Sequence, residues 1–434
     1  MKMKSIWMDT VSLPAFDRQK GDIKTDVLIV GGGMAGLLCG HYLQQAGVDY
    51  RLIEANTICS GVTGSTTAKI TSQHGLMYDK LLRRFGAEKA RLYYEANERA
   101  LERYRGICRD MDCDFEEKDS YVYACDDFRR LDRELAALEK IGVAADFTAK
   151  LPLPVSAVGA IRFPRQAQFH PLKFAAALAK DKQIFENTRA ISYEGDGVIC
   201  TNHGKIHAGK IIVTTHFPLF NKHGLYFMKL YQHRSYVLGL ENGPDVDGMY
   251  VDESKTGLSF RNYGKYLLLG GGSHRTGKQG GNWEELQAFA RKHYPDSKVQ
   301  YRWATQDCMS LDDVPYIGQY SQKIPDIFVG SGFNKWGMTG AMTAAMILSD
   351  QILGRENEYE GVFLPSRSVL RPQLLCNVLE SSANLLMPTK PRCPHMGCAL
   401  KWNKQERSWD CPCHGSRFDG QGRLLQNPAN DDLK

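Results

Sequence analysis

Short apolar runs alternate with longer stretches whose apolar residues recur at helical spacing. Residues 26–30 and 48–53 predict two buried strands, and the segment between them predicts a helix that ends near Gln45. Residues 76–109 and 128–141 predict two amphipathic helices. The other predicted elements are helices at 172–179 and 341–353, strands at 188–199 and 205–215, and a strand-rich region at 231–275. Strands that alternate with helices favour an α/β fold.

Composition is that of a large globular protein. The chain has 434 residues, 43% hydrophobic and 24% charged, enough for more than one domain. No apolar run approaches the ~18 residues of a membrane-spanning helix, and the N-terminus lacks the apolar core of a signal peptide. The net charge of +6 is mild. We therefore expect a cytoplasmic protein with no transmembrane segment and no nucleic-acid or membrane partner.

A glycine-rich turn follows the first predicted strand. Residues 31–36 read G-x-G-x-x-G and open the first helix, and the second strand ends on Glu54. This strand–turn–helix–strand context is typical of a dinucleotide site, with Glu54 on the ribose hydroxyls. The alternative is a glycine turn in an ordinary α/β unit. The residues expected to hold the pyrophosphate at the helix N-terminus are Gly31, Gly33, Met34, Ala35 and Gly36.

Three further segments favour FAD over NAD. Residues 61–69 are rich in glycine and hydroxyl groups, which can simply cap a helix. They also resemble the flavin-contacting segment of FAD enzymes of the D-amino-acid-oxidase-like superfamily, which includes glycine and sarcosine oxidases. Residues 313–318 and 327–340 resemble two more segments of that superfamily, so the likeness extends over residues 25–360. The FAD contacts that it implies are Gly64, Ser65, Thr66, Thr67, Ala68, Gly332, Trp336, Gly337, Met338 and Thr339.

The same resemblance implies a reaction and a substrate site. Relatives oxidise amines or amino acids by hydride transfer to flavin N5, and an arginine holds the substrate carboxylate. Arg261 is the best positional match for this arginine, and His274 and Arg275 can point at the same cavity. Structural pairing on the surface is the alternative for all three. Many relatives carry an arginine near position 306, where this chain has Gln306, and this leaves a plain amine substrate open.

Cysteine and histidine recur in two short loops near the end of the chain. Cys393 and His395 form C-x-H, and after fifteen intervening residues Cys411 and His414 form C-x-x-H in a C-P-C-H-G-S box. A Rieske [2Fe–2S] cluster needs two thiolates and two imidazoles; a structural zinc site is the competing interpretation. The block 393–418 resembles a Rieske domain in both boxes. The resemblance implies a disulfide between the two extra cysteines, Cys398 and Cys413.

The sequence thus predicts three parts. An FAD-dependent oxidoreductase domain at 1–365 combines FAD-binding parts at about 21–95, 160–230 and 310–360 with an antiparallel-sheet substrate domain at about 96–159 and 231–309. A linker at 366–389 leads to a small all-β Rieske domain at 390–434. This last domain is short of the strands that normally support its loops. The FAD domain or a partner chain must supply that support, or the cluster assembles poorly.

The leading functional hypothesis is an FAD-dependent amine or amino-acid dehydrogenase. Its flavin would take two electrons from the substrate and pass them singly through the cluster to an acceptor protein or a quinone. One alternative is an electron-transfer or redox-sensing protein without a dedicated substrate. The other is an oxidase that uses O₂ and carries a vestigial Rieske tail.

Overall fold

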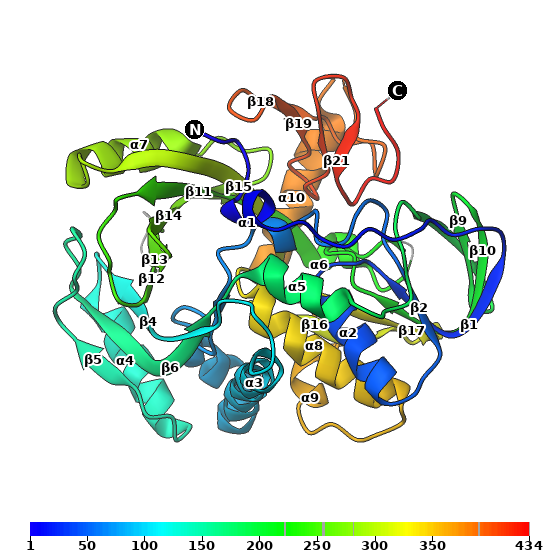
Figure 1. Ribbon diagram of the computed structural model, residues 1–434, viewed down its shortest axis with the longest axis horizontal. Helices are drawn as coiled ribbons and strands as arrows, with labels where there is room; N and C mark the ends of the chain where they lie inside the picture. Colours follow the sequence, from blue (N-terminus) through cyan, green and yellow to red (C-terminus); the bar gives the residue numbers. More distant parts are fainter. Residues whose placement is uncertain (221–222, 254–256, 281, 389–390, 434) are drawn as a thin grey trace.

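Three β-sheets organise the chain (Figure 1). The computed structural model describes residues 1–220, 223–253, 257–280, 282–388 and 391–433. Within these residues the sheets have eight, nine and four strands. In Figure 1 the nine-stranded sheet lies at the left, the eight-stranded sheet at the right, and the four-stranded sheet at the top. We call them the large sheet, the parallel sheet and the small sheet.

The parallel sheet is built around the glycine-rich turn. Strand β1 pairs in parallel with β2 and β10, and its last four residues are apolar and buried on both faces. Helices α2, α5 and α8 pack together against this sheet. The strands are β16 (Tyr316–Ser321), β17 (Ile324–Ser331), β10 (Gly204–Val213), β1 (Ile23–Val30), β2 (Tyr50–Ile53) and β7 (Ile184–Phe185), with β9 (Val198–Thr201) and β8 (Ala190–Gly195) beside β10. The helices are α2 (Met34–Gln45), α5 (Pro171–Ala179) and α8 (Gly337–Ile352).

The large sheet is almost entirely antiparallel. Its longest strands, β11 and β15, pair along nearly their whole length, and successive residues of each strand face opposite sides of the sheet. The strand order is β15 (Lys298–Ser310), β11 (Leu230–Glu241), β14 (Tyr266–Arg275), β13 (Ser259–Tyr263), β12 (Met249–Asp252), β4 (Glu116–Ala124), β6 (Gly159–Gln168) and β3 (Lys69–Ile70), with β5 (Asp146–Thr148) beside β6. Helix α7 (Asn282–His293) packs on β11 and β14.

Shorter helices and one long helix connect the sheets. The long helix changes direction at Gly86, whose φ of +82° is not helical. These elements are α1 (Ile6–Thr10), the 3₁₀ turn η1 (Thr63–Ser65), α3 (Tyr78–Cys108), α4 (Phe128–Lys140), α6 (Tyr226–Lys229), α9 (Glu360–Phe363) and α10 (Pro372–Leu386). The helices and strands predicted from periodicity therefore appear with ends shifted by a few residues, except that the single strand predicted at 188–199 is replaced by two antiparallel strands, β8 and β9. No helix of the described ranges is both long and apolar enough to cross a bilayer.

The small sheet carries the two Cys/His loops. Its strands are β18 (Lys401–Asn403), β19 (Ser408–Asp410), β20 (Arg417–Phe418) and β21 (Leu424–Gln426), in that spatial order. Together with the loops it forms what we call the cluster module, residues 391–433. Its four cysteines pack with Leu400, Phe418 and Ala429 in a core of its own. So few buried apolar residues stabilise a module this small only weakly.

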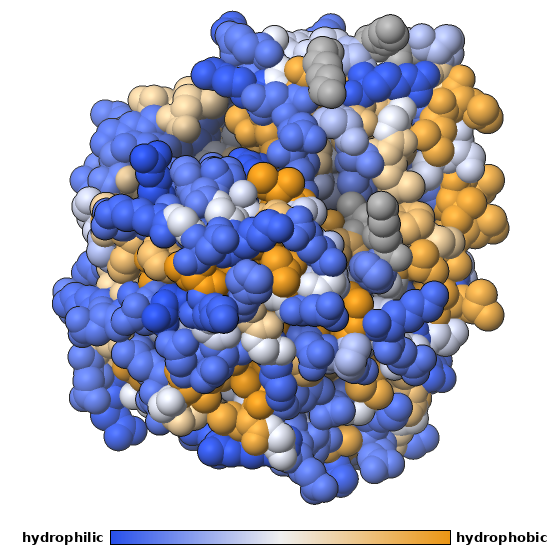
Figure 2. Space-filling view, turned by 90° about the vertical axis from the view of Figure 1, so that its right-hand side faces the viewer, coloured by the Kyte–Doolittle hydropathy of each residue, from blue (hydrophilic) through white to orange (hydrophobic). Residues whose placement is uncertain are grey.

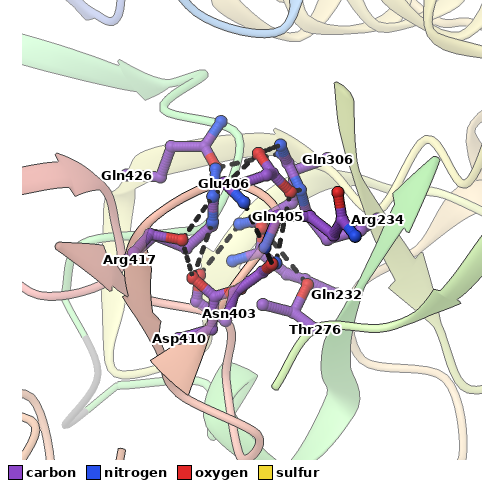
Figure 3. Close-up of polar contacts among 12 residues, drawn as sticks. Gln232, Arg234, Thr276, Gln306, Asn403, Gln405, Glu406, Asp410, Arg417 and Gln426 are labelled. Atoms are coloured by element: carbon purple, nitrogen blue, oxygen red, sulfur yellow. Dashed lines mark hydrogen bonds and ion pairs between the residues drawn. The ribbon is translucent and has the colours of Figure 1, made fainter. Parts of the chain in front are cut away.

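A buried ion network attaches the cluster module to the large sheet (Figure 3). The Arg234 guanidinium, from β11, pairs with the Glu406 carboxylate, which also accepts a hydrogen bond from Arg417 at 2.9 Å. Arg417 in turn donates to Asp410 at 2.9 Å. Burial raises the pKa of Glu406, but the two guanidiniums outweigh it and hold this pKa at about 2. The large sheet therefore supplies the support that the sequence leaves missing.

We expect Glu406→Gln to loosen the module without unfolding the rest. The change leaves buried Arg234 without its charge partner, which costs roughly 3–5 kcal/mol. Hydrogen exchange should show faster opening across residues 391–433, while the surface variant Glu102→Gln should behave as the parent. In the parent the stabilisation is complete above about pH 4.5 and fades only as the pH falls toward 2. Unchanged exchange in Glu406→Gln would contradict this account.

Candidate functional site

A cavity of about 570 Å³ lies where the parallel sheet meets the large sheet. The carboxyl ends of β1, β2 and β10 open onto one end of it, and the face of β11, β14 and β15 lines the other. Residues from the two sheets and from the start of α8 define its extent, among them Gly33, Glu54, Thr215, Ser235, Asp307 and Trp336. A crevice outside the carboxyl ends of parallel strands is the usual place for a nucleotide.

The glycine-rich turn aims the start of α2 at this cavity. Gly33 caps the helix, lines the cavity and has only the Thr63 hydroxyl, at 3.4 Å, near the position of an added Cβ. Gly31 has φ +112°, and an added Cβ would lie 2.8 Å from the Thr214 carbonyl oxygen. At Gly36 an added Cβ would lie 1.9 Å from the Gly31 carbonyl oxygen. The close approach that the glycines allow and the positive end of the helix dipole suit a pyrophosphate here.

Glu54 borders the same end of the cavity. Its carboxylate accepts hydrogen bonds from the backbone N–H of Gly32 at 2.8 Å and of Asn56 at 2.9 Å. Burial raises the pKa of Glu54, and these N–H groups act in the opposite direction. The carboxylate is therefore fixed where the ribose hydroxyls of a dinucleotide would lie.

The predicted FAD contacts fall into two groups. Those that line the cavity are Gly31, Gly33, Met34, Ala35, Glu54, Thr66, Thr67, Trp336, Gly337 and Met338. The others lie behind its wall: Gly36, Gly64, Ser65, Ala68, Gly332 and Thr339. Their contacts explain this placement, because the Ser65 carbonyl accepts from the Trp303 indole at 2.9 Å and the Thr339 hydroxyl donates to Thr71 O at 3.1 Å. We expect the first group to touch the cofactor and the second to shape the wall.

Arg261 does not face the cavity. It is 1% exposed, and its guanidinium donates to the carbonyl oxygens of Thr67 at 2.7 Å and Ala68 at 3.0 Å. The guanidinium carbon also lies 5.6 Å from the centre of the Trp7 ring. This placement corrects the expectation of a carboxylate clamp, since the side chain instead holds the segment that carries Thr66 and Thr67.

His274 and Arg275 are likewise engaged away from the cavity. His274 Nε2 lies 3.0 Å from the Tyr236 hydroxyl. Arg275 donates from Nε to Pro412 O at 3.1 Å and from Nη2 to Cys413 O at 3.2 Å. The expected substrate role is therefore corrected for both residues, and Arg275 instead supports the second Cys/His loop.

Sequence reasoning missed polar groups that line the far end of the cavity. Asp307 accepts a hydrogen bond from the Ser235 hydroxyl at 3.3 Å, and burial raises the pKa of Asp307 to about 6. The Lys335 ammonium donates to the Ser273 hydroxyl at 3.1 Å. Burial lowers the pKa of Lys69, which also lines the cavity, to about 7. Polar residues at alternate positions of β11 and β15 were the available signal.

The two Cys/His loops lie side by side and bring their histidine rings together. Cys393 and Cys411 are buried, and each cysteine accepts a backbone hydrogen bond from a glycine four residues later. The rings of His395 and His414 are 4.9 Å apart. Both ring nitrogens of His395 and the Nδ1 atom of His414 are buried. Among the described residues these three atoms have no hydrogen-bond partner. Burial lowers the pKa of both, to about 4 and about 3, which keeps them as neutral ligands.

This donor set fits an iron–sulfur cluster with two thiolates on one iron and two imidazoles on the other. The predicted ligands remain Cys393, His395, Cys411 and His414. The sulfur atoms of Cys398, Cys411 and Cys413 lie within 4.8 Å of one another as free thiols. The disulfide between Cys398 and Cys413 therefore stays a prediction.

The large sheet holds the second loop by its carbonyl groups. Gln232 on β11 donates to His414 O at 2.8 Å, and Gln306 on β15 donates to Gly415 O at 2.9 Å. These glutamines lie on the face of the sheet opposite to Ser235 and Asp307. The second cluster loop and the polar end of the cavity therefore lie on opposite faces of these strands, and residues 424–427 of the cluster module also border the cavity.

Fold and site together define a flavin-dependent oxidoreductase with an attached iron–sulfur module. The chain belongs to the FAD dependent oxidoreductase family, whose model matches residues 26–351, and a Rieske [2Fe-2S] domain model matches residues 368–434. The cofactors are accordingly FAD and a [2Fe–2S] cluster.

Comparison with known proteins extends this assignment to the whole chain. It is 33% identical over 495 aligned positions to YhfW, a Rieske 2Fe-2S iron-sulfur protein of Bacillus subtilis (strain 168), covering 99% of this chain and 97% of the relative. The alignment is longer than the 434 residues of the chain, so YhfW carries stretches without a counterpart here.

Solved structures show the same fold. L-proline dehydrogenase from P. horikoshii superposes with a TM-score of 0.67 at 17% identity, covering 80% of this chain and 98% of that chain. Glycine oxidase from Bacillus cereus ATCC 14579 superposes with a TM-score of 0.63 at 18% identity, covering 80% of this chain and 100% of that chain.

We expect Gly33→Val to abolish FAD retention. The branched side chain would enter the space from which a pyrophosphate must reach the start of α2, and we expect affinity to fall by roughly tenfold or more. Flavin absorbance per protein after purification measures the effect. Gly106→Val is the control, because an added Cβ there meets nothing within 4 Å. Full flavin occupancy in Gly33→Val would place the phosphate site elsewhere.

Arg261→Ala should lower stability and leave substrate affinity intact. Its loss removes hydrogen bonds from the carbonyl groups of Thr67 and Ala68 inside the protein, at a cost of roughly 2–4 kcal/mol. Chemical denaturation with bound flavin, compared with the exposed variant Arg129→Ala, checks the stability effect. A large rise in KM without any loss of stability would restore the carboxylate-clamp role.

Proposed function

We propose that this protein oxidises an amine or an amino acid in the cavity and passes the electrons singly through the [2Fe–2S] cluster to a one-electron acceptor. The coarse assignment, an FAD oxidoreductase of amino-acid-oxidase type with a Rieske domain, follows from the matched families. The substrate, the direction of electron flow and the acceptor are the proposal.

The observation that carries the proposal is the shared sheet. Adjacent residues of β15 face opposite sides: Gln306 binds the cluster loop, and Asp307 lines the cavity. On β11, Gln232 binds the same loop and Ser235 lines the cavity. Backbone and hydrogen bonds thus connect the two cofactor sites through one layer of strands, as an electron path between them needs.

The polar groups at the far end of the cavity suit a substrate with an amino group. Asp307, with a pKa of about 6, is mostly a carboxylate at neutral pH and can accept a proton from an ammonium group or pair with it. Lys335, held by Ser273, offers a cation for a substrate carboxylate. The structural relatives include a proline dehydrogenase and a glycine oxidase by name, which agrees with this substrate class.

Bound FAD would supply the two-electron oxidation. The chain contributes the walls around it. Leu424 and Leu425 of the cluster module form part of the cavity wall, and Asn427 donates to Phe217 O at 3.1 Å. This wall covers one side of the cavity.

Cys411→Ser tests the electron path. We expect it to remove the EPR signal of a cluster with two imidazole ligands and to leave the flavin spectrum unchanged, because the FAD site lies in another part of the chain. Candidate amines should still bleach the flavin anaerobically, whereas turnover with a one-electron acceptor should fall by roughly tenfold or more. Cys376→Ser, exposed on α10, is the control.

Other results would favour the alternatives. Flavin that no amine or amino acid reduces, in a protein with a loaded cluster, would support redox sensing. Stoichiometric peroxide with undiminished turnover in Cys411→Ser would support an oxidase. Zinc in place of iron, after expression with ample iron, would remove the electron path.

A further inference from the structure

Helix α10 turns its polar side inward. Asn377 and Asn384 are almost fully buried. Asn377 accepts a hydrogen bond from Arg275 at 2.8 Å, and Glu380 pairs with Lys278. The backbone carbonyl of Asn384 accepts from Ala399 N at 3.0 Å, in the first cluster loop. Asn377 and Glu380 thus contact residues at and just after the end of β14, and Asn384 contacts the cluster module, whereas Ser382 is exposed.

The opposite side of α10 is apolar and faces outward. Leu375, Val378, Leu379, Leu385 and Leu386 recur at helical spacing, and Leu379 and Leu386 are 61% and 84% exposed. The exposed surface continues beyond both helix ends through Leu370, Met387 and Met396. We call these eight residues the outer face. Figure 2 shows apolar side chains gathered at the upper right of the molecule, at the height of the cluster module in Figure 1.

A patch of this kind is costly in water. Helices of water-soluble proteins normally bury their apolar stripe and expose their polar one, the reverse of what α10 does. Contiguous exposed apolar surface beyond a few hundred Å² usually marks an interaction site. The described residues of the chain leave this stripe uncovered.

Charge around the outer face has one sign. Between residues 364 and 404 the sequence has six basic residues and one acid, Glu380. Lys278 pairs with Glu380, and buried Asp312 pairs with Arg367, so five basic residues of this stretch remain outside these pairs. Arg371 precedes the helix and Arg392 follows it, with Lys390 of the sequence outside the described residues. The mild net charge of the whole chain hides this local excess, which is why the composition predicted no membrane partner.

We propose that the outer face docks on the surface of an anionic lipid bilayer. A neutral apolar stripe between basic ends matches the apolar and headgroup layers of such a surface. The patch is spread along the helix and the loops at both of its ends, as contact with an extended surface requires. A second copy of the chain would instead bring two basic rims together.

Docking through the outer face would also place the cluster near the lipid, a consequence that rests on the proposed function. Met396 belongs to the outer face and directly follows the predicted cluster ligand His395. Docking would therefore turn the cluster toward the lipid, and an acceptor dissolved in the bilayer, such as a quinone, would meet it there. The lipid contact itself depends on neither flavin chemistry nor electron transfer.

Vesicle flotation of the purified holoprotein tests the docking surface. We expect it to float with vesicles of phosphatidylcholine containing phosphatidylglycerol, and less with phosphatidylcholine alone. Leu379→Gln with Leu386→Gln should lower the partition coefficient by on the order of tenfold or more. The matched control is Val158→Gln with Ile191→Gln, two exposed apolar residues outside the patch, which should leave it within about twofold.

Three outcomes would overturn the docking proposal. The proposal is wrong if the holoprotein stays unbound to vesicles of either composition, or if the control variant loses binding to the same extent as the patch variant. A dimer detected by light scattering that the patch variant abolishes, without vesicle binding, would assign the face to a second copy. The variant Cys411→Ser, which lacks the cluster, should still float with the vesicles. Lipid docking can therefore be judged separately from the proposed electron path.

Discussion

The buried pairing of Arg234 and Arg417 with Glu406 and Asp410 fixes the position of the cluster module. Two positive and two negative charges meet where almost no water reaches them. Such a set tolerates the low dielectric only when it is complete, because any single unpaired charge would be expensive. The core of the module is small, so its packing alone cannot replace the ion network as the attachment to the large sheet. The second Cys/His loop accepts hydrogen bonds from Gln232, Gln306 and Arg275. All of them require the module to keep its position against the large sheet.

One layer of strands therefore serves two sites. The alternation of side chains along β11 and β15 sends glutamines to the cluster loop and polar groups such as Asp307 to the cavity. A substitution on either strand thus changes the site on the face that its side chain occupies, while both sites share the same backbone. The absence of an arginine at position 306 acquires a physical reason, because Gln306 is committed to the carbonyl of Gly415 and to the neighbouring Gln232.

The sequence predicts the parts of this protein that depend on local backbone geometry. The glycine turn before α2 and the two Cys/His boxes are short motifs in which each residue's role is set by neighbours in the chain, and the helices follow from periodicity. Arg261, His274 and Arg275 were assigned by position on strands, and there the prediction failed. Which face of a strand meets the cavity depends on packing between distant segments, such as Arg261 with Thr67 or Arg275 with Pro412. The inward polar side of α10 was equally invisible, since an amphipathic pattern does not say which side is buried.

The wall that the cluster module contributes to the cavity bears on how the protein matures. Leu424, Leu425, Gln426, Asn427 and Asn430 complete the cavity only once the module is seated. A large cofactor that enters through this side would therefore bind more easily before the module is seated. Flavin loading would then precede final closure during biogenesis, and a cell that fails to build the iron–sulfur loops would also hold its flavin less securely.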